Sequence, residues 1–320
     1  MSPFHTPRIP QTRVDKGRDL PFSAGLPVSL VECPRDAMQG WPHIIPTEKK
    51  IDYLNALLQV GFDTLDFGSF VSARAIPQMA DTAEVIRHLD KGRSRDRDAS
   101  RSRVSTRLLA IVANFRGAEE AAGYDLIDCL GFPFSVSETF QLRNANKTID
   151  GSLATVEEML AICAAKEKEL IVYLSMAFGN PYGDPWSEEL VYEWAESLSR
   201  LGVKTLSVAD TVGLATPDQV FSVTDYLIRQ LPGCTIGVHL HSTHRNWKAK
   251  IDAALQAGCR RFDGALKGIG GCPMAGDELV GNMDSALMIP YFQDAGLLTG
   301  LDQVALQESL RIAGEIFTKE

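Results

Sequence analysis

Along most of this chain, short apolar runs alternate with longer segments in which apolar residues recur every three or four positions. The short runs have the length and composition of buried strands, and the longer segments have the spacing of one apolar helix face. The predicted strands cover residues 28–32, 64–70, 107–114, 126–131, 170–178, 205–210, 235–241 and 261–266. Helices are predicted over 47–61, 79–90, 152–168, 187–202 and 246–258, with another beginning near Pro217 and a short one after residue 114.

The ends of two predicted helices carry start and stop residues. Thr47 and Gly61 stand at the two ends of the first helix as cap and stop, and Pro217 stands in the first turn of its helix. Alternation of strand and helix predicts a parallel sheet with helices outside it. About eight units in roughly 290 residues fit a closed barrel better than an open sheet. We therefore predict an α/β fold, a single (β/α)8 TIM barrel with an extra C-terminal helical segment.

This pattern divides the chain into three regions. Residues 1–25 form a polar tail, 26–300 the catalytic barrel, and 301–320 a C-terminal helix expected to pack on the barrel. Segment 91–107 interrupts the alternation with a net charge of +5. Because it joins a helix to the following strand, we expect it on the face opposite the chemistry, as a solvated loop rather than a polyanion-binding arm.

Composition narrows the class of protein. The 320 residues are 45% hydrophobic with a net charge of −9, which counts against a general nucleic-acid binder. Six cysteines are scattered without a C-x-x-C pair, which indicates a reducing compartment. No apolar run approaches the ~20 residues of a membrane helix. We expect a cytoplasmic protein, with the mitochondrial matrix as the alternative for a eukaryotic chain, and no membrane partner.

Two histidines stand two positions apart in "TIGVHLHSTHRN". Side chains at i and i+2 of a strand point the same way, so His239 and His241 are expected side by side at a strand's carboxyl end. A pair of hydrogen-bonded, half-buried histidines is the alternative to metal ligation. The choice depends on what the rest of the chain brings beside them.

The ends of the other predicted strands supply that chemistry. In a barrel of this type, functional residues collect where strands end and the following loops begin. Closure places the eighth strand beside the first and seventh, so Asp36, the two histidines and a residue of the final loop can converge. Two imidazoles, a carboxylate and an amide oxygen suit Mg²⁺ or Mn²⁺, and ligand type alone does not exclude Zn²⁺, Co²⁺ or Fe²⁺.

A glycine-rich loop, "GIGGCPMAG", follows the eighth strand. Its glycines allow backbone geometry that is closed to other residues. Cys272 stands in this loop between Gly and Pro, so core packing does not explain it. A thiol on a loop over a metal site can donate or accept a proton, and a partly buried inert cysteine is the alternative.

Five stretches together resemble the 3-hydroxy-3-methylglutaryl-CoA lyase family: "ECPRDAMQ", "GSFVSARAIPQMADTAEV", "VADTVGLATP", "VHLHSTH" and "GIGGCPMA…GN". The resemblance covers about residues 28–295. It implies a divalent metal held by Asp36, His239, His241 and Asn282. It further implies that Arg35 stabilises an enolate oxygen and that Cys272 transfers a proton, with Asp66 and Asp210 matching acidic positions near the site.

The resemblance also implies the reaction. We expect cleavage of 3-hydroxy-3-methylglutaryl-CoA to acetyl-CoA and acetoacetate, as in leucine degradation, by a homodimer. This chain departs from the family at Asp66, where Glu is usual, at Ser242, where Asp is frequent, and at Ile171, where Arg is frequent. The alternatives are an aldolase or acyl-CoA condensing enzyme of the same superfamily, an Fe(II) oxygenase with two histidines and one carboxylate, and a binding barrel without activity.

Overall fold

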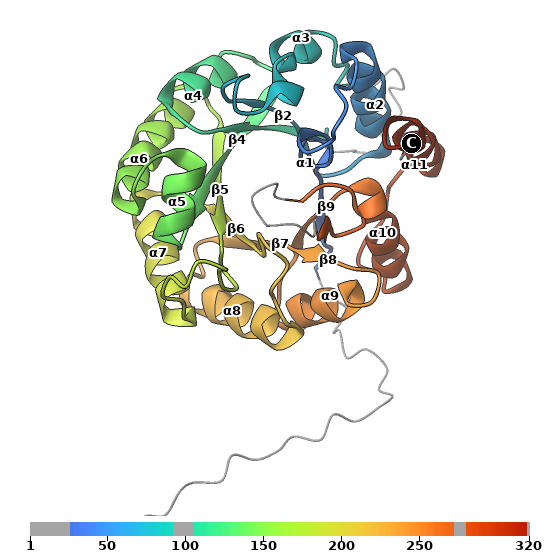
Figure 1. Cartoon of the computed structure of the whole chain (residues 1–320). Helices are drawn as coiled ribbons and strands as arrows, with labels where there is room; N and C mark the ends of the chain where they lie inside the picture. Colours follow the sequence, from blue (N-terminus) through green and yellow to red (C-terminus); the bar gives the residue numbers. More distant parts are fainter. Residues whose placement is uncertain (1–25, 92–104, 272–279, 319–320) are drawn as a thin grey trace, which may run out of the picture.

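The computed structural model describes residues 26–91, 105–271 and 280–318. Within these residues, eight parallel strands close into one barrel in the order β1-β2-β3-β4-β5-β6-β7-β9 (Figure 1). Their bounds are β1 Ser29–Glu32, β2 Thr64–Phe70, β3 Arg107–Val112, β4 Ile127–Ser135, β5 Glu169–Ser175, β6 Thr205–Ala209, β7 Thr235–His239 and β9 Arg261–Gly264. The predicted TIM barrel is therefore confirmed.

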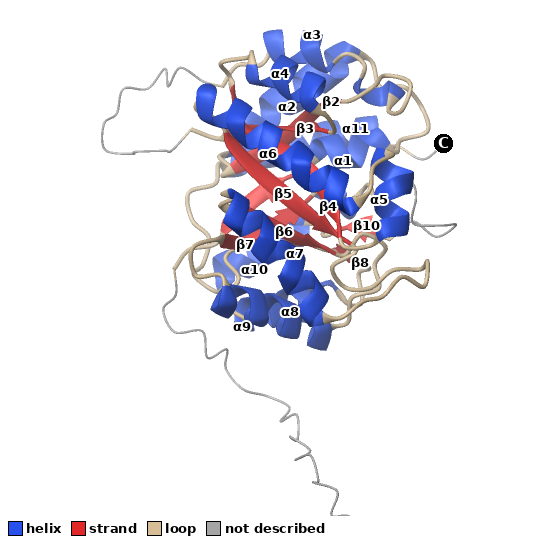
Figure 2. Cartoon of the chain, turned by 90° about the vertical axis from the view of Figure 1, so that its left-hand side faces the viewer, coloured by secondary structure: helices blue, strands red, loops and turns tan. Residues whose placement is uncertain are grey.

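Helices surround the barrel on the outside, as Figure 2 shows with helices in blue around red strands. The longer ones are α2 Thr47–Val60, α6 Ile149–Ala165, α7 Glu188–Leu201, α8 Pro217–Gln230, α9 Trp247–Gln256, α10 Ser285–Asp294 and α11 Gln303–Ile316. The shorter ones are α1 Pro34–Gln39, α3 Thr82–Arg87, α4 Phe115–Ala122, α5 Glu138–Ala145, and the 3-10 turns η1 Pro77–Met79 and η2 Leu266–Gly268. Their apolar faces and the outward strand residues bury one continuous core.

Two helix predictions need correction, and one helix was not predicted. The N-cap of α2 is Pro46, and Thr47 instead donates its hydroxyl to Asp81. The helix predicted over 79–90 is only Thr82–Arg87, because Gln78 accepts a hydrogen bond from the Ile45 amide and holds a separate turn before it. Helix α5 was not predicted, since its 8 residues are too few to show a clear helical period.

The seventh predicted strand also differs. The barrel strand β7 ends at His239, and His241 begins a separate strand, β8 His241–Ser242. β8 pairs antiparallel with β10 Gly281–Asn282 at the carboxyl end of the barrel. The break follows because the carbonyl of Leu240 accepts from Met283 instead of from a barrel strand.

The C-terminal helix α11 lies against α2 on the outside of the barrel. The ring of Phe317 contacts Trp41 edge-on, with ring centroids 5.2 Å apart. The boundary at residue 300 stays a prediction, and the predicted tail 1–25 lies outside the described residues. The basic segment begins at Lys91 and ends at the start of β3, which lies at the amino end of the barrel. Its residues 92–104 also lie outside the described residues.

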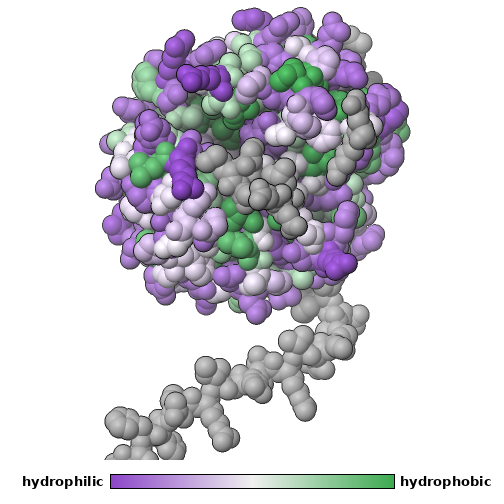
Figure 3. All heavy atoms as spheres, in the orientation of Figure 1, coloured by the Kyte–Doolittle hydropathy of each residue, from purple (hydrophilic) through white to green (hydrophobic). Residues whose placement is uncertain are grey.

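Figure 3 shows the carboxyl face, where hydrophilic side chains cover most of the surface and smaller hydrophobic patches lie among them. None of the described helices is long and apolar enough to cross a membrane.

Candidate metal centre

Three predicted ligands meet at the carboxyl end of the barrel. Asp36 comes from α1, His239 from the last position of β7 and His241 from the first position of β8. One ligand atom from each lies within 4.8 Å of the others, and all three side chains are buried. The two imidazole rings are 5.4 Å apart between centroids and nearly perpendicular, at 82°. The predicted convergence is therefore what the fold produces.

One ring nitrogen of His241 is hydrogen-bonded and the other is not. Its Nδ1 lies 2.6 Å from the carbonyl oxygen of Asp210, and a carbonyl can only accept, so Nδ1 carries the proton. Its Nε2 is buried and has no hydrogen-bond partner among the described residues. Burial and the neighbouring His239 lower the pKa of His241, which favours the neutral ring that a metal needs.

The ring of His239 is oriented by a carboxylate. Its Nδ1 lies 3.3 Å from Oδ2 of Asp263, and the other oxygen of Asp263 accepts from Arg261 at 2.8 Å. Burial alone would lower the pKa of His239, but its hydrogen bond to Asp263 and that carboxylate's charge outweigh burial and raise the pKa. A carboxylate behind Nδ1 is the usual support of a metal-binding histidine and leaves Nε2 for the ligand position.

Asn282 joins the cluster through the pairing of β10 with β8, which places it opposite His241. Its Nδ2 donates to Asp36 Oδ2 at 2.7 Å and to the carbonyl of Ile269 at 2.8 Å. Because the Ile269 carbonyl can only accept, the amide orientation is fixed. Oδ1 of Asn282 is left buried with no partner among the described residues.

The residues fit a divalent metal. Two buried acceptors without partners, Nε2 of His241 and Oδ1 of Asn282, are costly to leave unpaired, and a cation would satisfy both. Burial would raise the pKa of Asp36, but Arg35 and the two histidines outweigh it and lower the pKa, so the carboxylate is ionised. Mixed imidazole and oxygen donors match Mg²⁺, Mn²⁺ and related ions.

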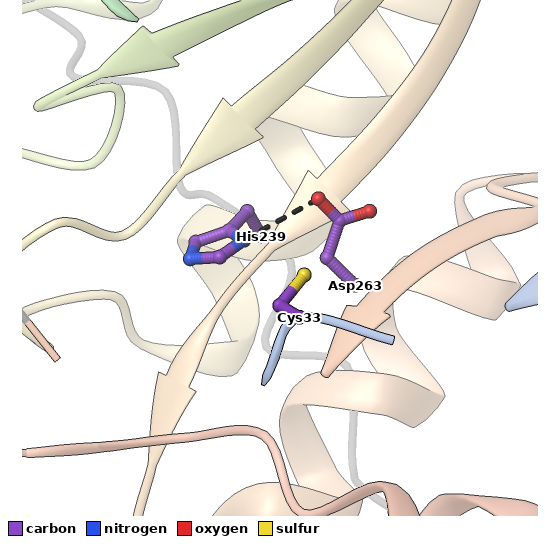
Figure 4. A group of neighbouring side chains, drawn as sticks. All are labelled: Cys33, His239 and Asp263. Carbon is purple, nitrogen blue, oxygen red and sulfur yellow. Dashed lines mark hydrogen bonds and ion pairs between the residues drawn. The ribbon is translucent and has the colours of Figure 1, made fainter. Parts of the chain in front are cut away.

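A second group of three side chains shares His239 with the first and lies deeper in the barrel: Cys33, His239 and Asp263 (Figure 4). Burial, and then Asp263 and Asp66, raise the pKa of the Cys33 thiol well above its usual value. A protonated thiol is a poor ligand. Asp263 is already engaged by Arg261 and His239, so the Asp36 group is the better metal site.

Arg35 and Asp66 lie beside the cluster and bind each other. Nε and Nη2 of Arg35 donate to the Asp66 carboxylate, at 3.0 and 2.5 Å, while Nη1 donates to Asp36 and Gln39. This leaves one N–H of Nη2 without a partner among the described residues. Burial would lower the pKa of Arg35, but Asp66 and Asp36 outweigh it and raise the pKa. Asp66 therefore holds the guanidinium in place.

Asp210 also lies at the site, but its carboxylate is fully engaged. Oδ2 accepts from the ammonium of Lys250 at 2.7 Å, and Oδ1 accepts from the amide of Ala215 at 3.0 Å. What Asp210 offers His241 is its backbone carbonyl. Cys272, the predicted proton-transfer residue, lies outside the described residues.

Sequence reasoning missed three buried residues around the histidines: Lys250, Arg261 and Asp263. For the last two a signal was available, because "RFDGAL" was a predicted strand and its alternate residues 261 and 263 must share a face. Lys250 gave no such signal, since a lysine in a helical segment is normally solvated.

The barrel and its donor set define a (β/α)8 protein with a candidate divalent-metal centre, at which two histidines, a carboxylate and an amide converge. A family model described as HMGL-like matches residues 30–312, and the chain belongs to this family. The cytoplasmic 3-hydroxy-3-methylglutaryl-CoA lyase of Mus musculus is 31% identical over 309 residues, 96% of this chain and 85% of that protein.

Two other proteins are similar to this chain over most of its length. The (R)-citramalyl-CoA lyase of Chloroflexus aurantiacus is 32% identical over 280 residues, 87% of both chains. The structure of an HMG-CoA lyase from Acinetobacter baumannii in complex with coenzyme A and 3-methylmalate has a TM-score of 0.79 and 30% identity, and covers 92% of both chains.

Proposed function

We propose that this protein is a divalent-metal-dependent carbon–carbon lyase that cleaves 3-hydroxy-3-methylglutaryl-CoA to acetyl-CoA and acetoacetate. The observation that carries the proposal is the buried group of Asp36, His239 and His241, with Nε2 of His241 and Oδ1 of Asn282 left unpaired beside it. Membership of the HMGL-like family and similarity to named lyases of this substrate support it.

Asp36, His239, His241 and Asn282 would hold the metal, with Mg²⁺ or Mn²⁺ as the preferred ions. When bound, such an ion lowers the pKa of a substrate hydroxyl and orients the neighbouring oxygens. The residues around it do the rest of the positioning. Asp263 and the Asp210 carbonyl fix the tautomers of the two imidazoles, and Asp66 fixes the guanidinium of Arg35.

The reaction needs one proton removed and one returned. The tertiary alcohol at C3 gives up its proton to water and becomes the ketone of acetoacetate as the C2–C3 bond breaks. The bonding electrons pass to the thioester fragment, which leaves as an enolate. In this proposal the unpaired N–H of Arg35 donates to the enolate oxygen, and Cys272 protonates the enolate carbon to give acetyl-CoA and then regains its proton from water.

A second candidate substrate has the same chemistry. Similarity to an (R)-citramalyl-CoA lyase favours a shorter 3-hydroxyacyl-CoA that also carries a tertiary alcohol. Both substrates would use the same metal, the same enolate and the same proton donor. They differ in the length of the carboxylate arm.

The test is a cleavage assay that offers both acyl-CoA substrates with added Mn²⁺ or Mg²⁺ and identifies the products by mass spectrometry. We expect acetyl-CoA and acetoacetate, with activity lost on chelation and restored by metal. His241→Ala should lose both metal and activity, whereas His88→Ala, an exposed histidine beyond α3, should change neither. Full turnover by chelated enzyme would reject the metal role, and cleavage of the shorter substrate alone would assign the second candidate.

We extend the proposal to a homodimer that acts on coenzyme A thioesters in leucine degradation in the cytoplasm, without a nucleic-acid or membrane partner. Sedimentation of the purified chain and the phenotype of a deletion strain grown on leucine would test these points separately.

A further inference from the structure

Lys250 is a lysine of helix α9 whose whole side chain is buried, with a relative exposure of 1%. Its Nζ donates to Oδ2 of Asp210 at 2.7 Å and to the backbone carbonyl of His241 at 2.7 Å. An ammonium group loses several kcal/mol of solvation when it enters a protein interior, and only close partners recover this loss. Here one partner is a candidate metal ligand itself.

The other partner, Asp210, binds both histidine positions through its backbone. Its amide donates to the carbonyl of His239 at 2.9 Å, and its carbonyl accepts from Nδ1 of His241 at 2.6 Å. Its second carboxylate oxygen accepts from the amide of Ala215. Lys250 therefore binds Asp210, whose carbonyl fixes the tautomer and the direction of the His241 ring. It also binds the backbone carbonyl of His241 directly.

The position of this contact matters because β7 has already ended there. His241 belongs to the two-residue strand β8 and is not held by the barrel's own ladder. Its ring direction depends on β10, on the Asp210 carbonyl and on Lys250. A buried ion pair is weak evidence for stability in general, so the location of this one, directly behind a ligand, is the informative observation.

We propose that Lys250 is a positioning residue of the metal centre, which acts through Asp210 and through the His241 backbone to present Nε2 of His241 to the metal. The inference rests on the proposed metal site. In this role Lys250 contacts neither the substrate nor the metal.

The chain offers a matched control. Lys50 in α2 is also buried, with a relative exposure of 3%, and its Nζ binds the carboxylate of Asp81 at 2.7 Å and the carbonyl of Gln78. Lys50 and Lys250 therefore have the same kind of partners, but none of the four candidate ligands contacts Lys50. Lys50→Met removes a lysine–aspartate pair in which the lysine is buried and the aspartate partly exposed, without touching the candidate centre.

The experiment measures Mn²⁺ binding by the full-length chain, wild type, Lys250→Met and Lys50→Met, by titration with detection of free Mn²⁺ by electron paramagnetic resonance. Loss of residues that support ligands typically weakens metal affinity about 10–100-fold. We expect that loss for Lys250→Met, and wild-type affinity for Lys50→Met. Wild-type affinity in folded Lys250→Met would overturn the proposal, and so would equal weakening in the two variants.

Two further measurements keep the test decisive. If Lys250→Met does not fold, the double variant Lys250→Met with Asp210→Asn removes the unpaired carboxylate and keeps the backbone carbonyl of residue 210, and its Mn²⁺ affinity should still fall.

The second measurement is the tautomer of His241. In metal-free wild type, long-range ¹H–¹⁵N spectra should show His241 with the proton on Nδ1, and Lys250→Met should populate both tautomers. If the wild type itself binds no Mn²⁺, the proposed function fails, whereas unchanged tautomers and affinity in the variant refute only the role of Lys250.

Discussion

Arg35 is the residue whose surroundings most restrict what it can do. Four of its five N–H groups are taken by Asp66, Asp36 and Gln39, and the remaining one lies on Nη2. Such an arrangement costs no reorganisation when charge develops beside it, which is how preorganised donors lower a barrier. The guanidinium is thus better suited to stabilising a transition state than to gripping a mobile substrate.

Arg35→Gln should therefore lower kcat about 10²–10³-fold, the usual effect of one oxyanion donor, and change KM little. Steady-state kinetics on the acyl-CoA substrate would measure this. The variant leaves the buried carboxylate of Asp66 without its charged partner, which could destabilise the fold. The double variant with Asp66→Asn removes that unpaired charge and is the control for stability. An effect confined to KM would mean that Arg35 only binds substrate.

Cys272→Ser should nearly abolish turnover and leave Mn²⁺ affinity unchanged. Serine is close in size to cysteine but has a far higher pKa than a thiol near 8.5, so it exchanges a proton poorly at neutral pH. Alkylation should inactivate the wild type, with protection by bound substrate. Cys259 is buried, so Cys259→Ser is the matched control and should leave turnover unchanged. Near-wild-type turnover in the Cys272 variant would remove it from the mechanism.

Among the elements, the start of the loop that follows η2 passes close to two of the candidate ligands. Gly270 has φ of +100°, and a Cβ there would lie 2.5 Å from Nδ2 of Asn282 and 2.8 Å from the carbonyl of Asp36. Only glycine allows both the backbone conformation and the contact. The loop and α1 thus fix the spacing of two candidate ligands that are far apart in the sequence.

Gly270→Ala should weaken Mn²⁺ binding strongly, because the added methyl group displaces Asn282 or Asp36. Gly179→Ala is the matched control, since Gly179 also has a positive φ, +114°, but no atom within 4 Å of an added Cβ. Both variants carry the same kind of backbone strain, so calorimetric titration with Mn²⁺ isolates the steric effect. Equal affinities in the two variants would contradict this account of the loop.

A second element contact joins the end of β1 to η2 and α10. Glu32 is fully buried and accepts from the amide of Leu266 at 2.7 Å and from the hydroxyl of Ser285 at 2.5 Å. Burial raises its pKa from 4.5 to about 8, although these two hydrogen bonds oppose the shift. The folded protein therefore keeps Glu32 protonated at a pH where the unfolded chain has already lost the proton.

Unfolding consequently releases a proton between pH 4.5 and about 8, and the contribution of Glu32 to stability falls as the pH rises through that window, by up to about 1.4 kcal/mol per pH unit. Glu32→Gln should flatten this part of the pH dependence in urea unfolding measured from pH 5 to 8. The exposed Glu48→Gln should leave it unchanged. A slope that persists in the Glu32 variant would place the responsible group elsewhere.

For the molecule as a whole, the candidate ligands come from opposite ends of the chain. The hydrogen bond from Asn282 to Asp36 spans 246 positions. A metal at this point would link the first and last units of the barrel and bind only the folded state. Its binding energy would therefore appear in the stability of the entire domain.

Mn²⁺ at 100 times its Kd should raise the free energy of unfolding by about 2.7 kcal/mol, seen as a higher Tm that a chelator reverses. His241→Ala should show little of this shift, whereas His88→Ala should show all of it. A Tm that is indifferent to Mn²⁺ in the wild type would count against a site at the barrel's carboxyl end.

The sequence by itself determined the strand–helix alternation, and with it the barrel and the edge where His239, His241 and Asp36 gather. These follow from local periodicity and from the geometry that any closed parallel barrel imposes. The resemblance of its motifs to a lyase family identified the family to which the chain belongs.

Only the tertiary structure decided how the ligands are held. The separation of β8 from β7, the pairing that sets Asn282 opposite His241, and the burial of Lys250 behind both depend on contacts between distant segments. So does the union of Arg261, Asp263 and His239 inside the barrel. Local patterns fix which face a residue takes, but the partner of a buried polar group is chosen by the surrounding fold, because that group must be satisfied wherever the chain brings a donor or acceptor within reach.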